Sequence, residues 1–502
     1  MSFNKPRGNI TTVLDLVSRD SQDNYFFPLD STQSWFSNEP YQKSYTTANS
    51  ISEWPCRGVA DWGGRLEFVL GNAKAGDLLR DVIFQFRIGH WYDDNTISKL
   101  QKYEYVGVAE DSPSPPWTYI NSLGTSIIDY AEIQIGDQTI ETLSSEFIRT
   151  YYTLYPDINT AFGIGCDGSG DGTNLELSTN TGMFSPLRPW PTERGIYMCV
   201  LPFFFTRTRL KETIPILSCA DQSIRIIIYL KPFSSCVRIA KSDAVRTSCT
   251  DTPLGKTITF DKSGGGTATI HTSDTIPRIQ DARIVTVCPL LSEPMRMNYL
   301  RKPFEQMYKF VQIFSFDEPL KYIVSKPSST NNDVIDIQLP LELNHPVQEL
   351  VWVFQRKAVE VNNEWSNLQP FVASQYKQTR FFPEWLNYAS LRINGVLVEQ
   401  GPGHRFRYDC AQKHLGGLIA WSSYIYGHSF AQFPDDHRPS GTLNMSRSHA
   451  VVLNLSVNVP TAIPTVEGFG NIVPNGWSVF VFALYYNWMR FENGIANRIF
   501  SN

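Results

Sequence analysis

The sequence has 502 residues and a formal net charge of −5 at neutral pH, with 13% aromatic and 19% charged residues. A chain of this length is expected to hold two or more domains. Its charged fraction lies below the ~25% of an ordinary soluble domain, which argues against disorder, a coiled coil or a helical bundle and favours a β-rich globular protein. The small acidic excess argues against a surface that neutralises nucleic-acid phosphates.

Strand patterns dominate the chain. Alternating apolar residues or β-branched and aromatic runs predict strands at 65–70, 78–88, 127–140, 223–230, 282–287, 334–343, 347–354, 391–398, 451–457 and 478–486. The segment 127–140 is predicted to be a hairpin, because Gly136-Asp137 supplies a turn. Helical periodicity is limited to short segments at 145–155 and 299–310. The chain is therefore predicted to be all-β, with short helices in its loops.

Three of these blocks recur in the same order, which indicates an internal repeat. Residues 77–86 align without gaps on 345–354, residues 131–141 align on 389–399, and Ile196-Tyr197 followed by 223–230 corresponds to Ile425-Tyr426 followed by 451–455. One such match could be chance, whereas three in the same order favour a duplication. The chain is most simply two copies of one β-domain.

The repeat predicts the domain organisation. We expect an N-terminal arm at 1–44, a first domain at 45–235, a Ser/Thr/Gly-rich linker or insertion at 236–275 and a second domain at 276–502. A duplicated unit of roughly 200 residues with about eight strands and long loops is typical of a jelly roll. The predicted fold is therefore two tandem eight-stranded jelly rolls.

The eight cysteines are irregularly spaced and form no Cys-x-x-Cys motif. In a chain of this length they are predicted to be free, mostly buried thiols made in a reducing compartment, with a disulfide between two of them as the alternative. No window of about 18 uncharged apolar residues predicts a transmembrane helix. The polar first twenty residues lack the apolar core of a signal peptide.

One loop contains a candidate cation site. Asp167, Ser169 and Asp171 occupy the first, third and fifth positions of a pattern that matches the front half of a calcium loop. Ser178 stands where that loop needs a bidentate glutamate. The favoured interpretation is a loop tip, with a weak cation site as the alternative, and no cofactor is predicted.

No motif indicates catalysis. The eight histidines include no His-x-His, His-x-x-His or His-Glu-x-x-His pair, so a cupin-type metal site is not indicated. There is no Gly-x-Ser-x-Gly elbow, and Gly264-Gly-Gly266 lacks the Gly-Lys-Ser/Thr ending of a phosphate-binding loop. The sequence predicts no catalytic residue and no enzyme.

Four segments carry a family resemblance. They are Leu343-Asn-His-Pro-Val-Gln-Glu-Leu-Val-Trp352, the 429–447 block with Pro439-Ser-Gly441, Leu201-Pro-Phe-Phe-Phe205 followed by Ile214-Pro-Ile-Leu217, and the C-terminal block 483–494. Together they resemble the major capsid proteins of the nucleocytoplasmic large DNA viruses. The sequence departs from the family pattern at Asn444-Met-Ser446 and in the glycine-rich run near the C-terminus, and 156–195 and 236–275 match nothing in it.

The resemblance implies a double jelly roll that forms a pseudo-hexagonal homotrimer. Such trimers would tile an icosahedral shell over an inner membrane. The implied location is the virion, with assembly in the host cytoplasm. The implied partners are other copies of the chain, neighbouring trimers, minor capsid proteins and inner viral membrane proteins, without direct contact to nucleic acid.

Two other functions stay open at this point. The chain could be a minor capsid or vertex protein of the same virus class. It could also be a tandem jelly-roll enzyme that processes a metal or a glycan, either a bicupin or a glycan amidase. That enzyme would require clustered histidines or an acidic cleft between the domains.

Overall fold

The computed structural model describes part of the chain. The described residues are 47–71, 76–88, 117–120, 123–155, 196–207, 212–239, 254–255, 257–261, 267–271, 273–325, 334–357, 363, 365, 368, 384–415, 424–435, 439–458 and 476–500. The expected N-terminal arm at 1–44 lies outside them. All the strands and helices below belong to one unit, Thr47–Asn502.

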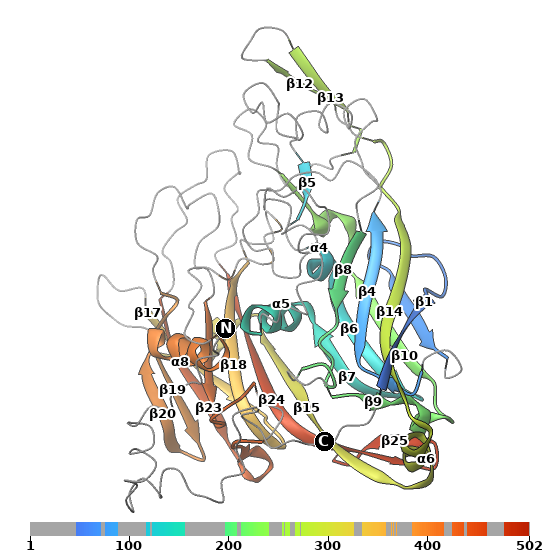
Figure 1. Ribbon diagram of the computed structural model, residues 1–502. Helices are drawn as coiled ribbons and strands as arrows, with labels where there is room; N and C mark the ends of the chain where they lie inside the picture. The colour runs from blue at the N-terminus through green and yellow to red at the C-terminus, as the bar shows by residue number, and fades with distance from the viewer. Residues whose placement is uncertain are drawn as a thin grey trace, which may run out of the picture. The chain divides into compact units, whose positions relative to one another are not determined.

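The first half of this unit forms two four-stranded antiparallel sheets (Figure 1). One has the order β1-β14-β4-β8 and the other the order β2-β10-β6-β7. The strands are β1 (Thr47–Pro55), β2 (Arg65–Leu70), β4 (Asp81–Ile88), β6 (Ile128–Ile135), β7 (Gln138–Ser144), β8 (Ile196–Val200), β10 (Ile224–Leu230) and β14 (Ile279–Leu291).

The second half repeats this arrangement. One sheet has the order β15-β24-β18-β21, and the other contains β17-β23-β19-β20. The strands are β15 (Phe304–Phe316), β17 (Val334–Leu341), β18 (Pro346–Arg356), β19 (Leu386–Ile393), β20 (Val396–Pro402), β21 (Ile425–Ser429), β23 (Val451–Asn458) and β24 (Trp477–Glu492). Three short strands extend these sheets, namely β16 (Ile323–Ser325), β22 (Leu443–Asn444) and β25 (Ile495–Arg498).

The two halves have the same topology. In each, the first, eighth, third and sixth principal strands form one sheet and the second, seventh, fourth and fifth form the other. This is the strand order of a jelly roll. The aligned sequence blocks occupy equivalent strands: β4 corresponds to β18, the hairpin β6-β7 to β19-β20, β8 to β21 and β10 to β23. The predicted all-β fold of two tandem eight-stranded jelly rolls is confirmed.

One strand lies on the other side of the expected boundary. The internal repeat predicts that the second domain begins at residue 276, which would include β14 in it. In the structure β14 pairs with β1 and with β4, and it completes the first jelly roll. The reason is topological, because the last strand of a jelly roll lies beside its first strand. The long insertion before β14 separates it from the other strands of the first jelly roll, so the sequence does not indicate this pairing.

The predicted helices are partly confirmed. The segment 145–155 forms α5 (Ser145–Leu154), which the Ser144 side chain caps by accepting the N–H of Phe147. The prediction of a helix at 299–310 is wrong, since α6 (Glu293–Arg301) ends there and β15 begins at Phe304. Pro303 explains the change: Lys302 before it has an extended backbone, and proline cannot continue a helix.

Several short helices and strands lie in the loops. Two further helices are α4 (Leu123–Ser126) and α8 (Gly403–Leu415). The 3-10 turns are η1 (Ile216–Cys219), η2 (Phe233–Cys236), η3 (Pro319–Tyr322) and η5 (Met445–Arg447). Three short strand pairs complete the described elements: β3 (Leu78–Leu79) with β9 (Ile214–Pro215), β5 (Trp117–Tyr119) with β11 (Val237–Ile239), and β12 (Thr257–Asp261) with β13 (Thr267–His271). The expected linker at 236–275 therefore contributes β11 and the β12-β13 hairpin.

Aromatic side chains fill the space between the sheets of each jelly roll. In the first, Phe84 of β4 lies edge-on to Phe68 of β2 with ring centroids 6.2 Å apart. In the second, the Phe354 ring stacks on that of Trp385 at 5.4 Å, and Trp352 is fully buried. The large aromatic fraction of the sequence therefore fills the interiors of both jelly rolls, which are parts of one continuous hydrophobic cluster.

Phe84 and Trp352 are equivalent residues of the repeat, so replacing each tests the two cores separately. We expect Phe84→Ala and Trp352→Ala each to lower the free energy of unfolding by about 3–5 kcal/mol, because each leaves a cavity in a packed interior. Urea unfolding measures the effect. Leu300→Ala, at a side chain that is 51% exposed, is the control and should change stability by less than about 0.5 kcal/mol; an equally small effect of the core variants would contradict the assignment.

Candidate functional site: the buried junction of the jelly rolls

The described residues hold no obvious reaction centre. No group of three or more His, Cys, Asp or Glu side chains among them could hold a metal ion. The candidate cation loop with Asp167, Ser169 and Asp171 lies outside the described residues. Within those same residues, no helix is long and apolar enough to cross a membrane. The densest set of buried polar side chains instead lies where the two jelly rolls meet.

Helix α5 supplies one side of this junction. Phe147, Tyr151 and Tyr155 are spaced four residues apart and therefore lie on one face of the helix and its C-terminal end. The Phe147 ring meets that of Phe482 in β24 edge-on, with centroids 5.3 Å apart. Tyr151 stacks on Tyr155 at 4.6 Å. An apolar helix face from the first jelly roll thus packs on a sheet of the second.

A buried carboxyl joins the strand edges. Glu141 Oε1, in β7, lies 2.8 Å from Arg207 Nη1 and accepts the backbone N–H of Val311 in β15 at 3.2 Å. Its Oε2 accepts the N–H of Phe204 at 2.8 Å. Burial raises the pKa of the Glu141 carboxyl, although the Arg207 charge and these hydrogen bonds oppose the rise. One side chain thereby ties three segments from both jelly rolls.

Arg207 extends the same connection. Its Nη1 donates to the carbonyl of Lys309 in β15 at 3.1 Å, and its Nε donates to the carbonyl of Pro202 at 2.9 Å. The guanidinium lies over the Phe147 ring, 4.9 Å from the centroid. The charge is fully buried and is compensated by Glu141, so the pair is a structural ion pair and not a surface one.

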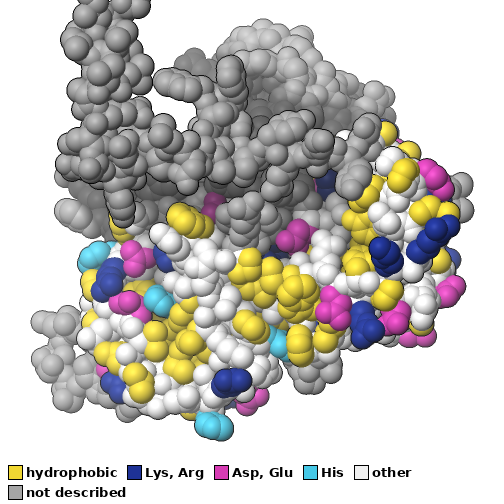
Figure 2. All heavy atoms as spheres, turned by 60° about the horizontal axis from the view of Figure 1, so that its bottom comes forward, with side chains coloured by type: hydrophobic (Ala, Val, Ile, Leu, Met, Phe, Trp, Pro, Cys, Tyr) yellow, Lys and Arg dark blue, Asp and Glu magenta, His cyan; other side chains and the backbone are white. Residues whose placement is uncertain are grey.

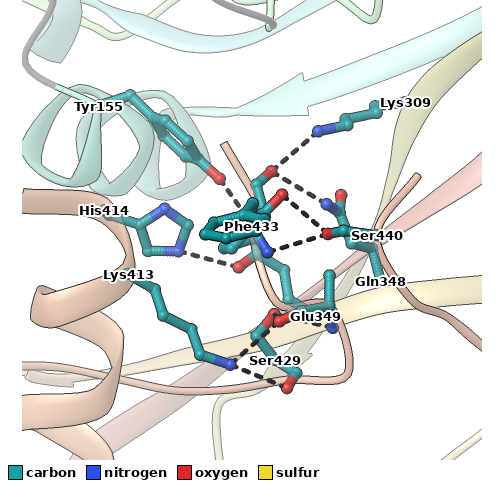
Figure 3. Close-up of polar contacts among 11 residues, drawn as sticks. Tyr155, Lys309, Gln348, Glu349, Lys413, His414, Ser429, Phe433 and Ser440 are labelled. Carbon is teal, nitrogen blue, oxygen red and sulfur yellow. Dashed lines mark hydrogen bonds and ion pairs between the residues drawn. The ribbon is translucent and has the colours of Figure 1, made fainter. Parts of the chain in front are cut away.

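A second carboxyl lies on β18. Glu349 Oε1 accepts the hydroxyl of Tyr155 at 2.8 Å, and its Oε2 lies 2.9 Å from Nε2 of His414 on α8 (Figure 3). Burial by itself would raise the pKa of Glu349, but interaction with His414 and the hydrogen bonds outweigh it, so the pKa is lowered. Tyr155 comes from the first jelly roll, and the other two residues come from the second.

This cluster does not have the properties of a hydrolase site, although it contains a histidine, a carboxylate and a nearby cysteine. The side chains of His414 and Glu349 are 1% and 2% exposed, so a substrate has no access to them. Burial raises the pKa of the Cys410 thiol well above its ordinary value, which keeps it protonated and unreactive. The arrangement serves to join the jelly rolls.

Two lysines hold a loop against this junction. Lys309 Nζ and the Gln348 amide both donate to the carbonyl of Pro434, at 2.8 and 3.0 Å (Figure 3). Lys413 Nζ donates to the carbonyls of Ser429 and Ala431, at 3.2 and 3.1 Å. The loop that follows β21 is therefore fixed through its backbone carbonyls, which accept hydrogen bonds from ammonium and amide N–H groups.

The loop, and Gln348 among its partners, come from two of the four segments that carry the family resemblance. The 343–352 block supplies Gln348 and His345, and the 429–447 block supplies the loop and β22. His345 has a left-handed backbone (φ 67°), its N–H donates to Ser446 Oγ at 2.7 Å, and its ring stacks on Tyr485 at 4.9 Å. The two blocks are one structural unit in space.

A third acidic side chain, Glu212, lies near β15. It precedes Thr213, whose carbonyl accepts the hydroxyl of Tyr308 in β15 at 2.8 Å. Oε2 of Glu212 is buried and has no hydrogen-bond partner among the described residues. Burial raises the pKa of Glu212 to about 7, partly offset by the charge of Lys309. This carboxyl therefore titrates close to neutral pH.

Sequence reasoning did not single out Glu141, Arg207, Glu349 or Glu212. Two of them had a usable signal, because Glu141 and Glu349 lie inside the repeated blocks at positions otherwise occupied by strand residues. A charged residue in a predicted strand indicates either a solvent-facing position or a buried pair, and the sequence does not distinguish these. Arg207 and Glu212 lie in irregular segments that carry no pattern.

Two family profiles match this chain. The profile described as "Large eukaryotic DNA virus major capsid protein" matches residues 308–497, and the profile "Major capsid protein N-terminus" matches residues 34–263. The profile at 308–497 covers the second jelly roll, and the profile at 34–263 covers most of the first jelly roll. The chain belongs to the major capsid proteins of large eukaryotic DNA viruses.

Curated relatives of this capsid protein agree. The major capsid protein of Pyramimonas orientalis virus is 24% identical over 222 residues, covering 42% of this chain and 49% of that protein. The major capsid protein of Phaeocystis pouchetii virus is 32% identical over 115 residues, covering 23% and 20%. The matches span about half and about a fifth of the length of these relatives.

Solved structures share the fold. VP54 of PBCV-1 has a TM-score of 0.60 at 16% identity, over 93% of this capsid protein and all of VP54. The Faustovirus major capsid protein has a TM-score of 0.59 at 10% identity, over 96% and 97% of the two chains. Since the family consists of structural proteins, the prediction that the chain is not an enzyme is confirmed.

The repeat offers a matched test of the buried ion pair. Glu141 and Glu399 are equivalent, but the Glu399 side chain is 26% exposed in its pair with Arg405. We expect Glu141→Ala to destabilise the protein by about 3–5 kcal/mol, because it leaves Arg207 buried without a counter-charge, and Glu399→Ala by about 0–1 kcal/mol. Equilibrium urea unfolding compares them, and equal effects at the two positions would refute a special role for Glu141.

The raised pKa of Glu212 predicts that the free energy of unfolding depends on pH. Its folded-state pKa of about 7 exceeds its ordinary value of 4.5, so its stabilising contribution is complete below about pH 4.5 and is lost as the pH rises through 7. As the pH rises from 5 to 8, the free energy of unfolding of Glu212→Gln should increase by about 2 kcal/mol relative to that of the wild type. Urea unfolding across this range measures it, with exposed Glu305→Gln as the control; parallel stability curves for wild type and Glu212→Gln would contradict the prediction.

Proposed function

We propose that the chain is the major structural subunit of an icosahedral large DNA virus capsid and assembles as a pseudo-hexagonal homotrimer that tiles the shell. The observation that supports this most directly is the duplication of one strand order in a single chain. Two similar jelly rolls in each of three subunits give six similar units, which is the number that a hexagonal lattice requires.

The domain division in this proposal follows the strand pairing. We propose a first jelly roll from β1 to β14, a connection through α6 and a second jelly roll from β15 to β25. The buried junction supports the use of the two jelly rolls as one rigid block, because Glu141, Arg207 and Glu349 are buried and form direct contacts between them. A shell unit has to keep this geometry under lateral load.

The proposed location is the virion, with assembly in the host cytoplasm. The cysteines of the described residues are free: Cys56 is half-buried, and Cys199, Cys219, Cys236, Cys288 and Cys410 are buried. Free thiols fit synthesis in a reducing compartment. The proposed partners are other copies of the chain, neighbouring trimers, minor capsid proteins and inner viral membrane proteins, and the net charge of −5 fits a protein that makes no direct contact with nucleic acid.

Light scattering coupled to size-exclusion chromatography tests the trimer. The purified protein in neutral buffer is expected to elute as a particle of three 57.1-kDa chains. A stable monomer over the micromolar range would overturn the proposal. A melting curve recorded on the same sample verifies that the chain is folded.

Copy number separates the major subunit from a minor capsid or vertex protein of the same virus class. In purified particles the major subunit has to be the most abundant protein, since it covers the faces of the shell. Quantitative mass spectrometry of the virion measures this. A copy number well below that of another capsid protein would assign the chain to the minor class.

A further inference from the structure

Lys309 is a basic residue of the interior. On the lower face of the molecule, basic side chains lie at the surface with acidic side chains near them (Figure 2). Lys309, by contrast, is only 3% exposed, and its Nζ lies 5.6 Å from the centroid of the Tyr486 ring. A lysine is rarely buried this completely unless it is paired or takes part in chemistry. The groups around it indicate which chemistry is open to it.

A carboxamide lies beside this ammonium. Nζ of Lys309 and Nε2 of Gln348 donate to the same atom, the carbonyl oxygen of Pro434, at 2.8 and 3.0 Å (Figure 3). Two groups that share one acceptor are neighbours. Gln348 is 0% exposed, and its Oε1 has no hydrogen-bond partner among the described residues. The amide carbon Cδ thus lies near the lysine nitrogen, and its oxygen is available to take up charge.

The strands bring the two side chains to one face of the sheet. Lys309 of β15 pairs with Tyr486 of β24. Glu349 of β18 pairs with Leu484 of the same β24. Side chains two residues apart on a strand point to the same side, so Lys309 and Glu349 share a face. Gln348 would face the opposite side of a regular strand, but the register of β18 on β24 shifts around it. This bulge turns Gln348 toward Lys309.

An acid lies near the lysine as well. Burial raises the pKa of Glu212 to about 7, and the charge of Lys309 opposes the rise, so the two side chains interact. Oε2 of Glu212 is buried and has no hydrogen-bond partner among the described residues. A carboxyl with this pKa can take up and return a proton near neutral pH. The buried rings of Tyr308 and Tyr486 lie beside these groups and keep the surroundings apolar.

The first jelly roll lacks this combination of residues. In the alignment of 77–86 on 345–354, the equivalent of Gln348 is Arg80. Nε of Arg80 pairs with Asp81 at 2.9 Å. An arginine side chain has no carbonyl carbon for an amine to attack. The strand order therefore does not require a lysine beside a carboxamide, and the combination is particular to the second jelly roll.

We propose that Lys309 and Gln348 form an intramolecular isopeptide bond, which joins β15 to β18 across β24, and that Glu212 carries the proton for this reaction. Nζ of Lys309 attacks Cδ of Gln348, a new C–N bond forms, and the bond from Cδ to Nε2 breaks. Glu212 accepts a proton from the lysine and returns it to the leaving nitrogen. One ammonium and one carboxamide become a secondary amide and a free ammonium ion, so no oxidant or further reactant is needed.

The bond strengthens the strand that carries the junction. β15 is at the edge of its sheet, and its backbone hydrogen-bonds to Glu141 and Arg207 of the first jelly roll. A covalent link from β15 to β18 restricts the unfolded chain, as a disulfide does. The amide N–H that remains on Nζ keeps the hydrogen bond to Pro434. The link therefore holds the edge strand in place without removing a contact of the loop.

Intact-mass spectrometry of the purified full chain tests the bond. The wild type should weigh less than its sequence by one molecule of ammonia, and a tryptic digest should contain a branched peptide that joins Lys309 to Gln348. Lys309→Met and Gln348→Met should each have the full sequence mass. Gln355→Met is the matched control and should keep the loss. Gln355 is also a buried glutamine of β18 and donates to a loop carbonyl, that of Trp365, at 3.0 Å, but in the described part of the chain no lysine shares this acceptor.

Glu212→Gln keeps the test independent of folding defects, because Oε2 of Glu212 has no hydrogen bond to lose among the described residues. In freshly synthesised protein this variant should lose ammonia about 10²–10⁴-fold more slowly than the wild type. A melting curve on each sample verifies that it is folded. A folded wild type with the full sequence mass would overturn the bond, as would an ammonia loss that the digest places at another residue. Equal rates in the wild type and Glu212→Gln would overturn the role of Glu212.

Discussion

The structure depends on one buried ion pair at the meeting point of its two halves. Glu141 and Arg207 both belong to the first jelly roll, and each also forms a hydrogen bond with the backbone of β15 in the second. A buried charge of this kind is costly unless a counter-charge and hydrogen bonds compensate it. The pair therefore adds directional contacts to the apolar packing between the 203–207 turn and β15.

Much of the fold could be predicted from the sequence, because jelly-roll strands leave local signals. The alternation at β2, β6 and β23 and the repeated blocks at β4 and β18 are visible without a structure. The boundary was misplaced at β14 because its partner, β1, lies more than two hundred residues away, and strand pairing at that distance leaves no local pattern. The helix expected at 299–310 does not form, because Pro303 cannot continue a helix whatever the periodicity of the residues around it.

The junction was much harder to predict than the strands. Glu141 and Glu349 stand in strands, where a carboxylate is ordinarily a solvent-facing residue, and only the fold shows that another jelly roll covers them. The repeat does not indicate that Glu141 is buried, since this residue aligns with the partly exposed Glu399. Equivalent residues have the same backbone setting and different neighbours, and the neighbours decide burial and ionisation. Sequence similarity between the two halves therefore identifies equivalent positions, while the differences in burial mark where each half meets something else.

The free cysteines have a consequence for the life cycle of such a particle. Burial raises the pKa of the Cys219 and Cys236 thiols to about 12, and that of Cys199 still further. Thiols in this state are poor nucleophiles and react slowly with disulfides and peroxides. These buried thiols therefore resist forming new covalent links when the protein passes from reducing to oxidising surroundings. At their positions the chains of an assembly stay individually separable, and no disulfide there has to be reduced to take the assembly apart.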